Sequence, residues 1–190
     1  MIWITSDFHL FHKKEFLYIP RGFSTIEEMN YQIIDNYNHV INQEDDIYIL
    51  GDLLLGGADN LENGLQLLNQ LKGKIHLIRG NHDSDIRWMA YKNLSNVVEM
   101  ENSLYLNYNH FHFYLSHFPT LTSNRDYDKP LKARILNLCG HTHTNNKWAD
   151  IDKGYIYHCE LDAHNNFPIL LDHIIEDFKN YSPLQLGNCE

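Results

Sequence analysis

The sequence predicts an α/β (α+β) fold in which two β-sheets pack together with helices outside them. In the first half of the chain, short runs of β-branched and aromatic residues alternate with amphipathic helical stretches. The middle and the end are richer in strand-like runs, which favours two sheets over one doubly wound sheet. Because the chain shows no repeat and no linker, we expect one domain over residues 1–180 and a C-terminal tail over residues 181–190.

The expected strands are short and end in Gly or polar residues, and the helices between them keep the helical spacing of apolar residues. The strands are expected at 3–5, 46–50, 74–78, 111–116, 134–139 and 155–161, with further strands and turns between 95 and 110. Helices are expected at 24–41, 61–71, 87–94 and 170–180. Ser24 and Glu27 have the spacing of a capping box at the start of the first helix.

The composition limits the partners that the chain can take. Its 15 Lys and Arg against 25 Asp and Glu give a formal net charge of −10, whereas proteins that grip duplex nucleic acid usually carry a basic face. Nucleic acid is therefore not favoured, although a metal site would leave small phosphate substrates open. No apolar run approaches the ~20 residues that span a membrane, and no signal peptide is evident, so we expect a cytoplasmic protein without membrane contact.

Metal-binding side chains gather where the predicted strands end. Asp7 and His9 follow the first strand at positions i and i+2, and His141 and His143 repeat that spacing late in the chain. Residues two apart on an extended chain point to the same side, so each pair can face one point. Similar side chains follow the other strands, namely Asp52, Asn81, His82 and His117. Ligands of open α/β sheets bind at such strand ends.

The donor types indicate the kind of metal. All are oxygen or imidazole groups and none is a thiolate, which suits manganese, iron or zinc and disfavours a structural zinc cluster. Without His82 the set offers seven ligands, namely two Asp, one Asn and four His, which are too many for one tetrahedral ion. If one Asp bridges, they suffice for two ions with four protein ligands each, with positions left for water and substrate.

Five short motifs occur in order along the chain: SDFH (6–9), LGD (50–52), RGNHD (79–83), SHFP (116–119) and GHTH (140–143). Together they resemble the five blocks of the calcineurin-like metallophosphoesterases. Longer segments, among them QEDDIYILGD and LDAHNNFPI, resemble a small bacterial and phage branch of that superfamily, and the resemblance covers nearly the whole chain. It implies a four-layer α/β/β/α sandwich of two mixed β-sheets flanked by helices, in the cytoplasm of a bacterium or of a phage host.

The resemblance also implies two metal-binding sets that share Asp52 as a bridge. The sets are Asp7, His9, Asp52 and His143, and Asp52, Asn81, His117 and His141. The cofactors would be two divalent ions, with manganese first and iron, zinc or nickel as alternatives. A hydroxide that bridges the ions would attack the phosphorus of a phosphodiester or phosphomonoester, with a small nucleotide-type substrate favoured. His82 matches the family histidine that faces the phosphate or the leaving group.

Several assignments keep an alternative. His12 is expected to contact the substrate or to have a structural role, and Arg21 to reach a substrate phosphate or to form a surface salt bridge. Asp83 is expected to orient His82 or to cap the following turn. The alternative functions are a nuclease acting on nucleic-acid ends, a mononuclear metal sensor, and a non-catalytic scaffold, because the fold also resembles a retromer scaffold subunit. Every motif position is retained, which favours the enzyme. The loops at 10–25, 55–60 and 119–130 carry no motif of substrate specificity, and no oligomeric state is predicted.

Overall fold

A computed structural model of the chain describes residues 1–57, 59–120, 122, 131–148 and 156–180. The expected tail, 181–190, and most of the loop 119–130 lie outside this part. The strands are β1 (Ile2–Thr5), β2 (Asp46–Ile49), β3 (Lys74–Ile78), β4 (Val97–Glu101), β5 (Ser103–Tyr108), β6 (Phe111–Ser116), β7 (Ile135–Cys139), β8 (Ile156–His158) and β9 (Ile169–Leu170). The α-helices are α1 (Glu15–Tyr18), α2 (Ile26–Val40), α3 (Asp59–Leu68), α4 (Asp85–Tyr91) and α5 (Leu171–Asn180).

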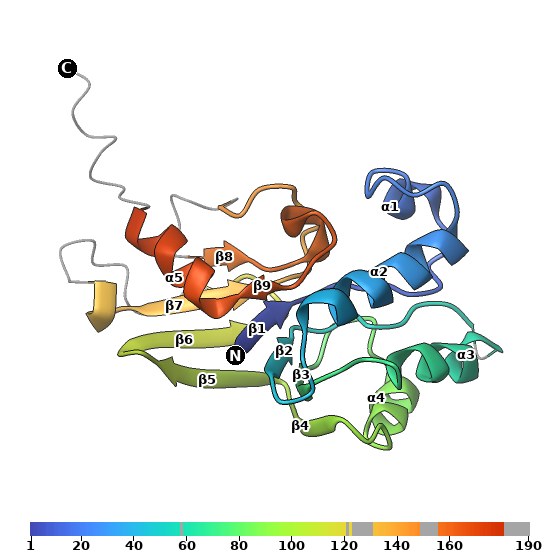
Figure 1. Ribbon diagram of the computed structural model, residues 1–190, viewed down its shortest axis with the longest axis horizontal. Coiled ribbons are helices and arrows are strands. Elements are labelled where there is room, and N and C mark those ends of the chain that lie inside the picture. The colour runs from blue at the N-terminus through green and yellow to red at the C-terminus, as the bar shows by residue number, and fades with distance from the viewer. Residues whose placement is uncertain (58, 121, 123–130, 149–155, 181–190) are drawn as a thin grey trace.

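The strands form two mixed sheets (Figure 1), of order β4-β3-β2-β1-β9 and β5-β6-β7-β8. In the larger sheet β1 to β4 run parallel, and only β9 runs antiparallel to its neighbour β1. In the smaller sheet β5 and β6 are antiparallel, and β6, β7 and β8 are parallel. Parallel strands end at one edge of a sheet, so the motifs that follow β1, β2 and β3 lie side by side.

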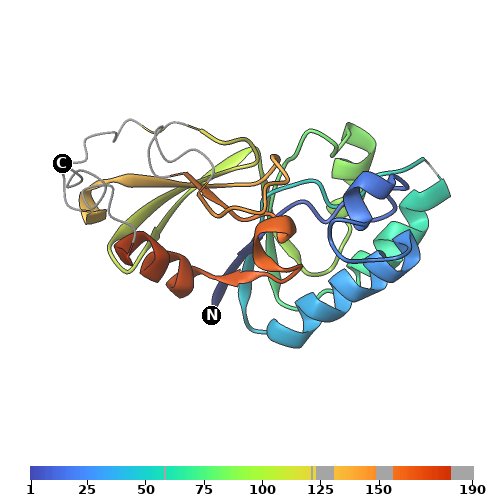
Figure 2. The ribbon, with the colours of Figure 1, turned by 90° about the horizontal axis from the view of Figure 1, so that it is seen from above.

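Alternation along the central strands produces two apolar cores. Ile47 and Ile49 of β2 face α2, α3 and α4, whereas Leu50 faces the second sheet and α5. Seen from above (Figure 2), α2 and α3 lie on one side of the molecule and α5 on the other, beside the second sheet. The predicted fold class, two mixed sheets flanked by helices, is confirmed.

The structure corrects local details of the expected elements. The capping box of α2 uses Thr25 and Glu28, because Glu28 N–H donates to Thr25 Oγ1 over 3.1 Å and Ser24 N–H donates to Glu28 Oε2 over 2.7 Å. The predicted pair of Ser24 and Glu27 is therefore one residue early. The short α1 and β9 were not predicted; β9 pairs with β1 just before α5 begins. No helix in the described part is both long and apolar enough to cross a membrane.

Candidate metal centre

The loops that carry the predicted ligands turn sharply. Asp7, His9, Asp52, His141 and His143 have φ angles of 60°, 49°, 58°, 77° and 50°. Non-glycine residues rarely adopt this left-handed conformation, and such strain is concentrated at functional sites. The expectation that each pair two residues apart lies on an extended chain is therefore wrong. At Asp7 and His9 a turning backbone brings the two side chains together.

The motif glycines allow these loops to touch. A Cβ atom on Gly80 would overlap Asp52 Oδ1, and one on Gly140 would overlap Asp7 Oδ2. Gly51 has a φ of 95°, and a Cβ there would lie 2.5 Å from the backbone nitrogen of Gly80. Real Cβ atoms do not approach other atoms so closely, so a side chain at these three positions would push the ligand loops apart.

Asp7, His9 and His143 form the first group of ligand atoms. Asp7 Oδ1 lies 3.4 Å from His9 Nε2 and 3.9 Å from His143 Nε2, and the two imidazole nitrogens are 3.0 Å apart. Asp7 Oδ1 is buried without a hydrogen-bond partner. A buried carboxylate oxygen normally has a partner, and these converging lone pairs fit a cation bound between them.

Asp52, His117 and Asn81 form the second group, which Asp7 also approaches, and the ring of His141 lies beside it. His117 Nε2 lies 2.7 Å from Asn81 Oδ1 and 3.4 Å from Asp52 Oδ2. The ring centroids of His117 and His141 are 5.0 Å apart. Asp52 Oδ2 also lies 3.6 Å from His9 Nε2 in the first group. One carboxylate oxygen thus faces both groups, and all seven predicted ligands come together.

Hydrogen bonds fix which imidazole nitrogens are available. His117 Nδ1 donates to Leu50 O over 2.7 Å, because a carbonyl oxygen can only accept. His143 Nδ1 lies 3.0 Å from Asp162 Oδ2, which leaves its Nε2 directed at the first group. Metal-binding histidines commonly donate their other nitrogen to a carbonyl or a carboxylate in this way. Both histidines are therefore oriented for ligation through Nε2.

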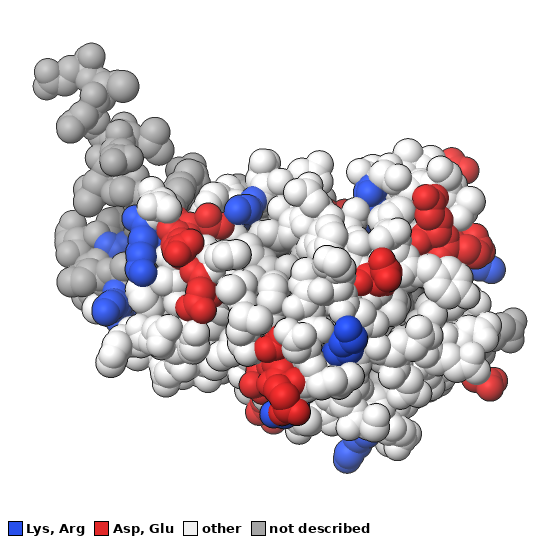
Figure 3. All heavy atoms as spheres, viewed as in Figure 1, with Lys and Arg blue, Asp and Glu red and all other residues white. Residues whose placement is uncertain are grey.

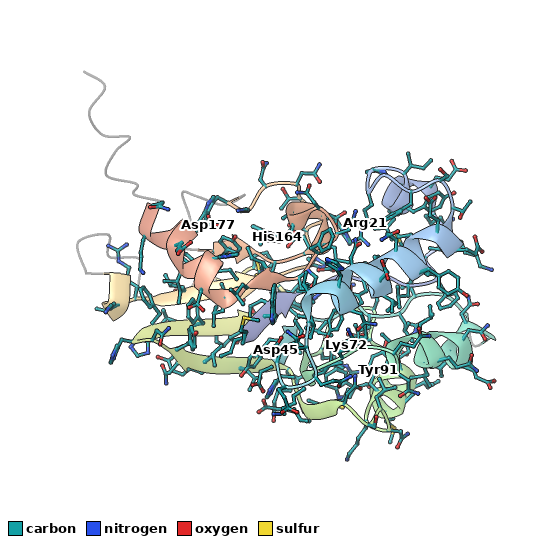
Figure 4. The ribbon with its side chains drawn as sticks, in the orientation of Figure 1. Arg21, Asp45, Lys72, Tyr91, His164 and Asp177 are labelled. Atoms are coloured by element: carbon teal, nitrogen blue, oxygen red, sulfur yellow. The ribbon has the colours of Figure 1, made fainter. Side chains whose placement is uncertain are left out.

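Arg21 is buried, with 7% of its surface exposed, and binds inside the protein. Its Nε and Nη2 donate to the two oxygens of Asp162 over 3.0 and 2.7 Å. Nη2 and Nη1 also donate to the carbonyl oxygens of Asp7, over 2.7 Å, and Phe8, over 3.1 Å. Figure 4 shows Arg21 beside the turn of residues 161–164. These contacts give Arg21 a structural role: it joins the partner of His143 to the loop of Asp7 and His9.

Asp83 is buried and ties two motif loops together. Its Oδ2 accepts the backbone N–H groups of Asp52 and Gly80, each over 2.9 Å. Its Oδ1 accepts the hydroxyl of Tyr91 over 3.2 Å. Ser84, and not Asp83, is the N-cap of α4. Asp83 therefore holds the loop of Asp52 against the loop of Asn81.

His82 and His12 lie at the rim of the centre. Their ring centroids are 5.3 Å and 5.8 Å from that of His9. The backbone N–H of His82 donates to Asp52 Oδ1 over 2.8 Å, which fixes the start of the side chain while the imidazole stays exposed. His12 is half-buried, and its Nδ1 has no hydrogen-bond partner. Both residues therefore lie beside the first ligand group.

The electrostatics of the centre suit metal binding. Burial would raise the pKa of Asp7, but His9, whose Nε2 lies 3.4 Å from Asp7 Oδ1, and the imidazoles of His117 and His143 lower it below its usual range. Burial lowers the pKa of His9 to about 4. A carboxylate that is ionised and an imidazole that is neutral are the forms that bind metal. Burial also raises the pKa of Asp52; the charges of Asp7 and Asp83 add to the rise, and that of His117 opposes it.

Comparison with known proteins gives concordant results. The family described as calcineurin-like phosphoesterase matches residues 1–185. The uncharacterized protein MJ1445 of Methanocaldococcus jannaschii is 34% identical over 144 residues, which cover 76% of this chain and 70% of that protein. The gene 66 protein of Mycobacterium phage L5 is 26% identical over 160 residues, which cover 75% and 77%. AQ665 of Aquifex aeolicus, a protein of unknown function, has the same fold, with a TM-score of 0.71 at 21% identity over 93% of this chain and 98% of that one.

Proposed function

The chain belongs to the calcineurin-like phosphoesterases, a family of metal-dependent hydrolases, and on that premise we propose that it works with two metal ions on small nucleotide-type phosphate esters. One observation carries the two-ion proposal. Asp52 Oδ2 lies 3.6 Å from His9 Nε2 and 3.4 Å from His117 Nε2, which belong to different ligand groups. A carboxylate oxygen placed between two sets of donors is suited to bridge two ions.

Each ion would be held by four protein groups. Asp7, His9, Asp52 and His143 would hold the first ion, and Asp52, Asn81, His117 and His141 the second. When bound, two divalent ions activate a water molecule and neutralise charge on the phosphoryl oxygens. Manganese is our first choice for these oxygen and imidazole donors, with iron, zinc and nickel as the alternatives.

The remaining residues of the centre would contact the substrate or hold a metal ligand in position. The N–H of the His82 imidazole would donate a hydrogen bond to the leaving oxygen and so stabilise the charge that develops there. His12 would contact the ester group on the same flank of the centre. Arg21 and Asp162 would keep His143 directed at the first ion, because the bidentate ion pair holds the carboxylate that binds its Nδ1.

The charges support a small substrate. The net charge is −10, and on the face shown in Figure 3 the described Lys and Arg side chains are scattered among acidic and neutral ones. Near the centre, Arg87 donates to the carbonyl oxygens of His82 and Gly56. A protein that tracks a long polyanion needs free cations along its path. A small ester fits these charges better than a nucleic-acid end.

Hydrolysis of bis-p-nitrophenyl phosphate tests this function. We expect activity with Mn²⁺ that Asp52→Asn abolishes, since the substitution removes the shared charge. We expect His82→Ala to lower kcat by about 10²- to 10⁴-fold while metal binding persists, as loss of a proton-donating group commonly does. A wild-type protein that stays inert with manganese, iron, zinc and nickel but binds a protein partner would support the scaffold alternative.

A further inference from the structure

A hollow of about 440 Å³ adjoins the second ligand group. Asn81 and His117, two proposed ligands, form one end of it. The rest is lined by Phe118, Tyr114, Arg79 and short polar side chains that include Ser103. Small-molecule pockets combine apolar or aromatic walls with a few placed polar groups at volumes of roughly 300–1,000 Å³. This hollow has that composition and borders two of the proposed metal ligands.

Phe118 is the main apolar surface of the hollow. Half of its surface, 50%, is exposed. Its ring contacts two proposed ligands edge-on, with centroids 4.6 Å from His141 and 5.0 Å from His117. An exposed aromatic ring this close to the ligands can stack on a flat group attached to the phosphate, and stacking of a nucleobase on an aromatic side chain tolerates every base.

The backbone that carries Phe118 is firmly held. Ser116 Oγ and Thr120 Oγ1 both donate to Phe118 O, over 2.8 and 3.0 Å. The N–H of Thr120 donates to the side chain of the buried Asn137 over 2.8 Å. A ring on a fixed backbone loses little conformational freedom when a ligand stacks on it. Phe118 is thus a pre-organised surface.

The centre therefore has two flanks that can each receive an ester group. His82 and His12 lie on the side of His9, in the first ligand group, and Phe118 lies on the side of His117 and His141, in the second. A phosphomonoester has one organic group and would leave one flank empty, whereas a phosphodiester has two. The rim of the hollow also lacks a free cation among the described arginines, because Arg79 donates to Asp83 O and lies over Trp88.

We propose that the hollow beside Phe118 binds the non-leaving ester group of a phosphodiester, and that this group is a nucleoside whose base stacks on Phe118. The inference rests on the proposed phosphoesterase function and adds the class of substrate to it. The leaving group would occupy the flank of His82, where a hydrogen bond can meet the departing oxygen.

Three substrates that share the p-nitrophenolate leaving group test the proposal. They are thymidine 5′-(p-nitrophenyl phosphate), methyl p-nitrophenyl phosphate and p-nitrophenyl phosphate. We expect the wild type to prefer the thymidine diester in kcat/KM over the other two. Phe118→Ala should lower kcat/KM for the thymidine diester by about tenfold or more beyond the decrease in kcat/KM for the methyl diester, as loss of one base stack predicts. Phe118→Leu, which keeps an apolar side chain, guards against a misfolded variant and should show the same difference.

The control is Tyr105→Ala. Tyr105 is an exposed aromatic residue of β5 that does not line the hollow. This variant should have the same ratio of kcat/KM between the thymidine diester and the methyl diester as the wild type. Equal losses on both diesters in both Phe118 variants, or a wild type that prefers the monoester, would overturn the proposal while leaving the phosphoesterase function intact. If none of the three substrates is hydrolysed with manganese, iron, zinc or nickel, the proposed function itself is refuted.

Discussion

Replacement of Asp162 by Asn should weaken the first metal site selectively. Asp162 Oδ2 faces His143 Nδ1 at 3.0 Å, and both oxygens accept from Arg21. Asparagine keeps the shape but loses the charge, and its amide group must point N–H bonds at one of these donors. The orientation of His143 is then no longer fixed.

These contacts set the expected losses in metal affinity and in the free energy of unfolding. Loss of a carboxylate that orients a ligating histidine commonly costs 10- to 100-fold in metal affinity, or about 1.4–2.8 kcal/mol. Arg21 is left buried without a full counter-charge, and removal of one partner of a buried pair costs about 3–5 kcal/mol. Because asparagine can still accept one bond, we expect about 3 kcal/mol or less in the free energy of unfolding.

Calorimetric titration with Mn²⁺ and urea denaturation measure the two effects. Asp177→Asn is the matched control, because Asp177 also pairs with a basic side chain, Lys147, and accepts the hydroxyl of Tyr157, but outside the centre. It should leave both metal affinities unchanged. If Asp162→Asn binds two ions with wild-type affinity, or weakens both sites equally, the positioning role of Asp162 is refuted.

Three further predictions concern the centre. Gly140→Ala should abolish metal binding and cost about 1–3 kcal/mol of stability, because its Cβ would overlap Asp7; calorimetry and denaturation measure both. Mn²⁺ affinity should rise between about pH 6 and pH 8, because burial raises the pKa of Asp52 and the metal must displace that proton; titration at several pH values checks the sign. Free Mn²⁺ at about 100 times Kd should stabilise the fold by about 2.7 kcal/mol for each occupied site, seen as a rise in Tm that chelation reverses; an unchanged Tm would contradict specific binding.

Contiguous motifs explain why the sequence predicted the fold and why the side chains of the proposed centre lie close together. SDFH, LGD, RGNHD, SHFP and GHTH each place their side chains directly after a strand, and parallel strands bring those ends to one edge. The two-core arrangement likewise follows from alternation along β1, β2 and β3.

Long-range partners were not predictable in the same way. Arg21 and Asp162 lie 141 positions apart, and neither has a local pattern that indicates an ion pair. Asp162 does fall within LDAHNNFPI, and its place in that segment was the one available signal. The left-handed backbone at Asp7 and His9 had only a weak signal: a positive φ is uncommon in non-glycine residues, although Asp and His adopt it more often than most. It is imposed by tertiary contacts such as those of Arg21 with the carbonyl oxygens of Asp7 and Phe8.

The number of metal ions per chain tests the central proposal most directly. Protein reconstituted with Mn²⁺, freed of excess metal and analysed by inductively coupled plasma mass spectrometry should contain two ions per chain. His143→Ala, which removes a ligand of the first group only, should contain one, and Asp52→Asn, which removes the shared carboxylate, should lose affinity at both positions. A wild-type chain that binds a single ion, or an Asp52→Asn variant that still binds two with unchanged affinity, would contradict a centre bridged by Asp52.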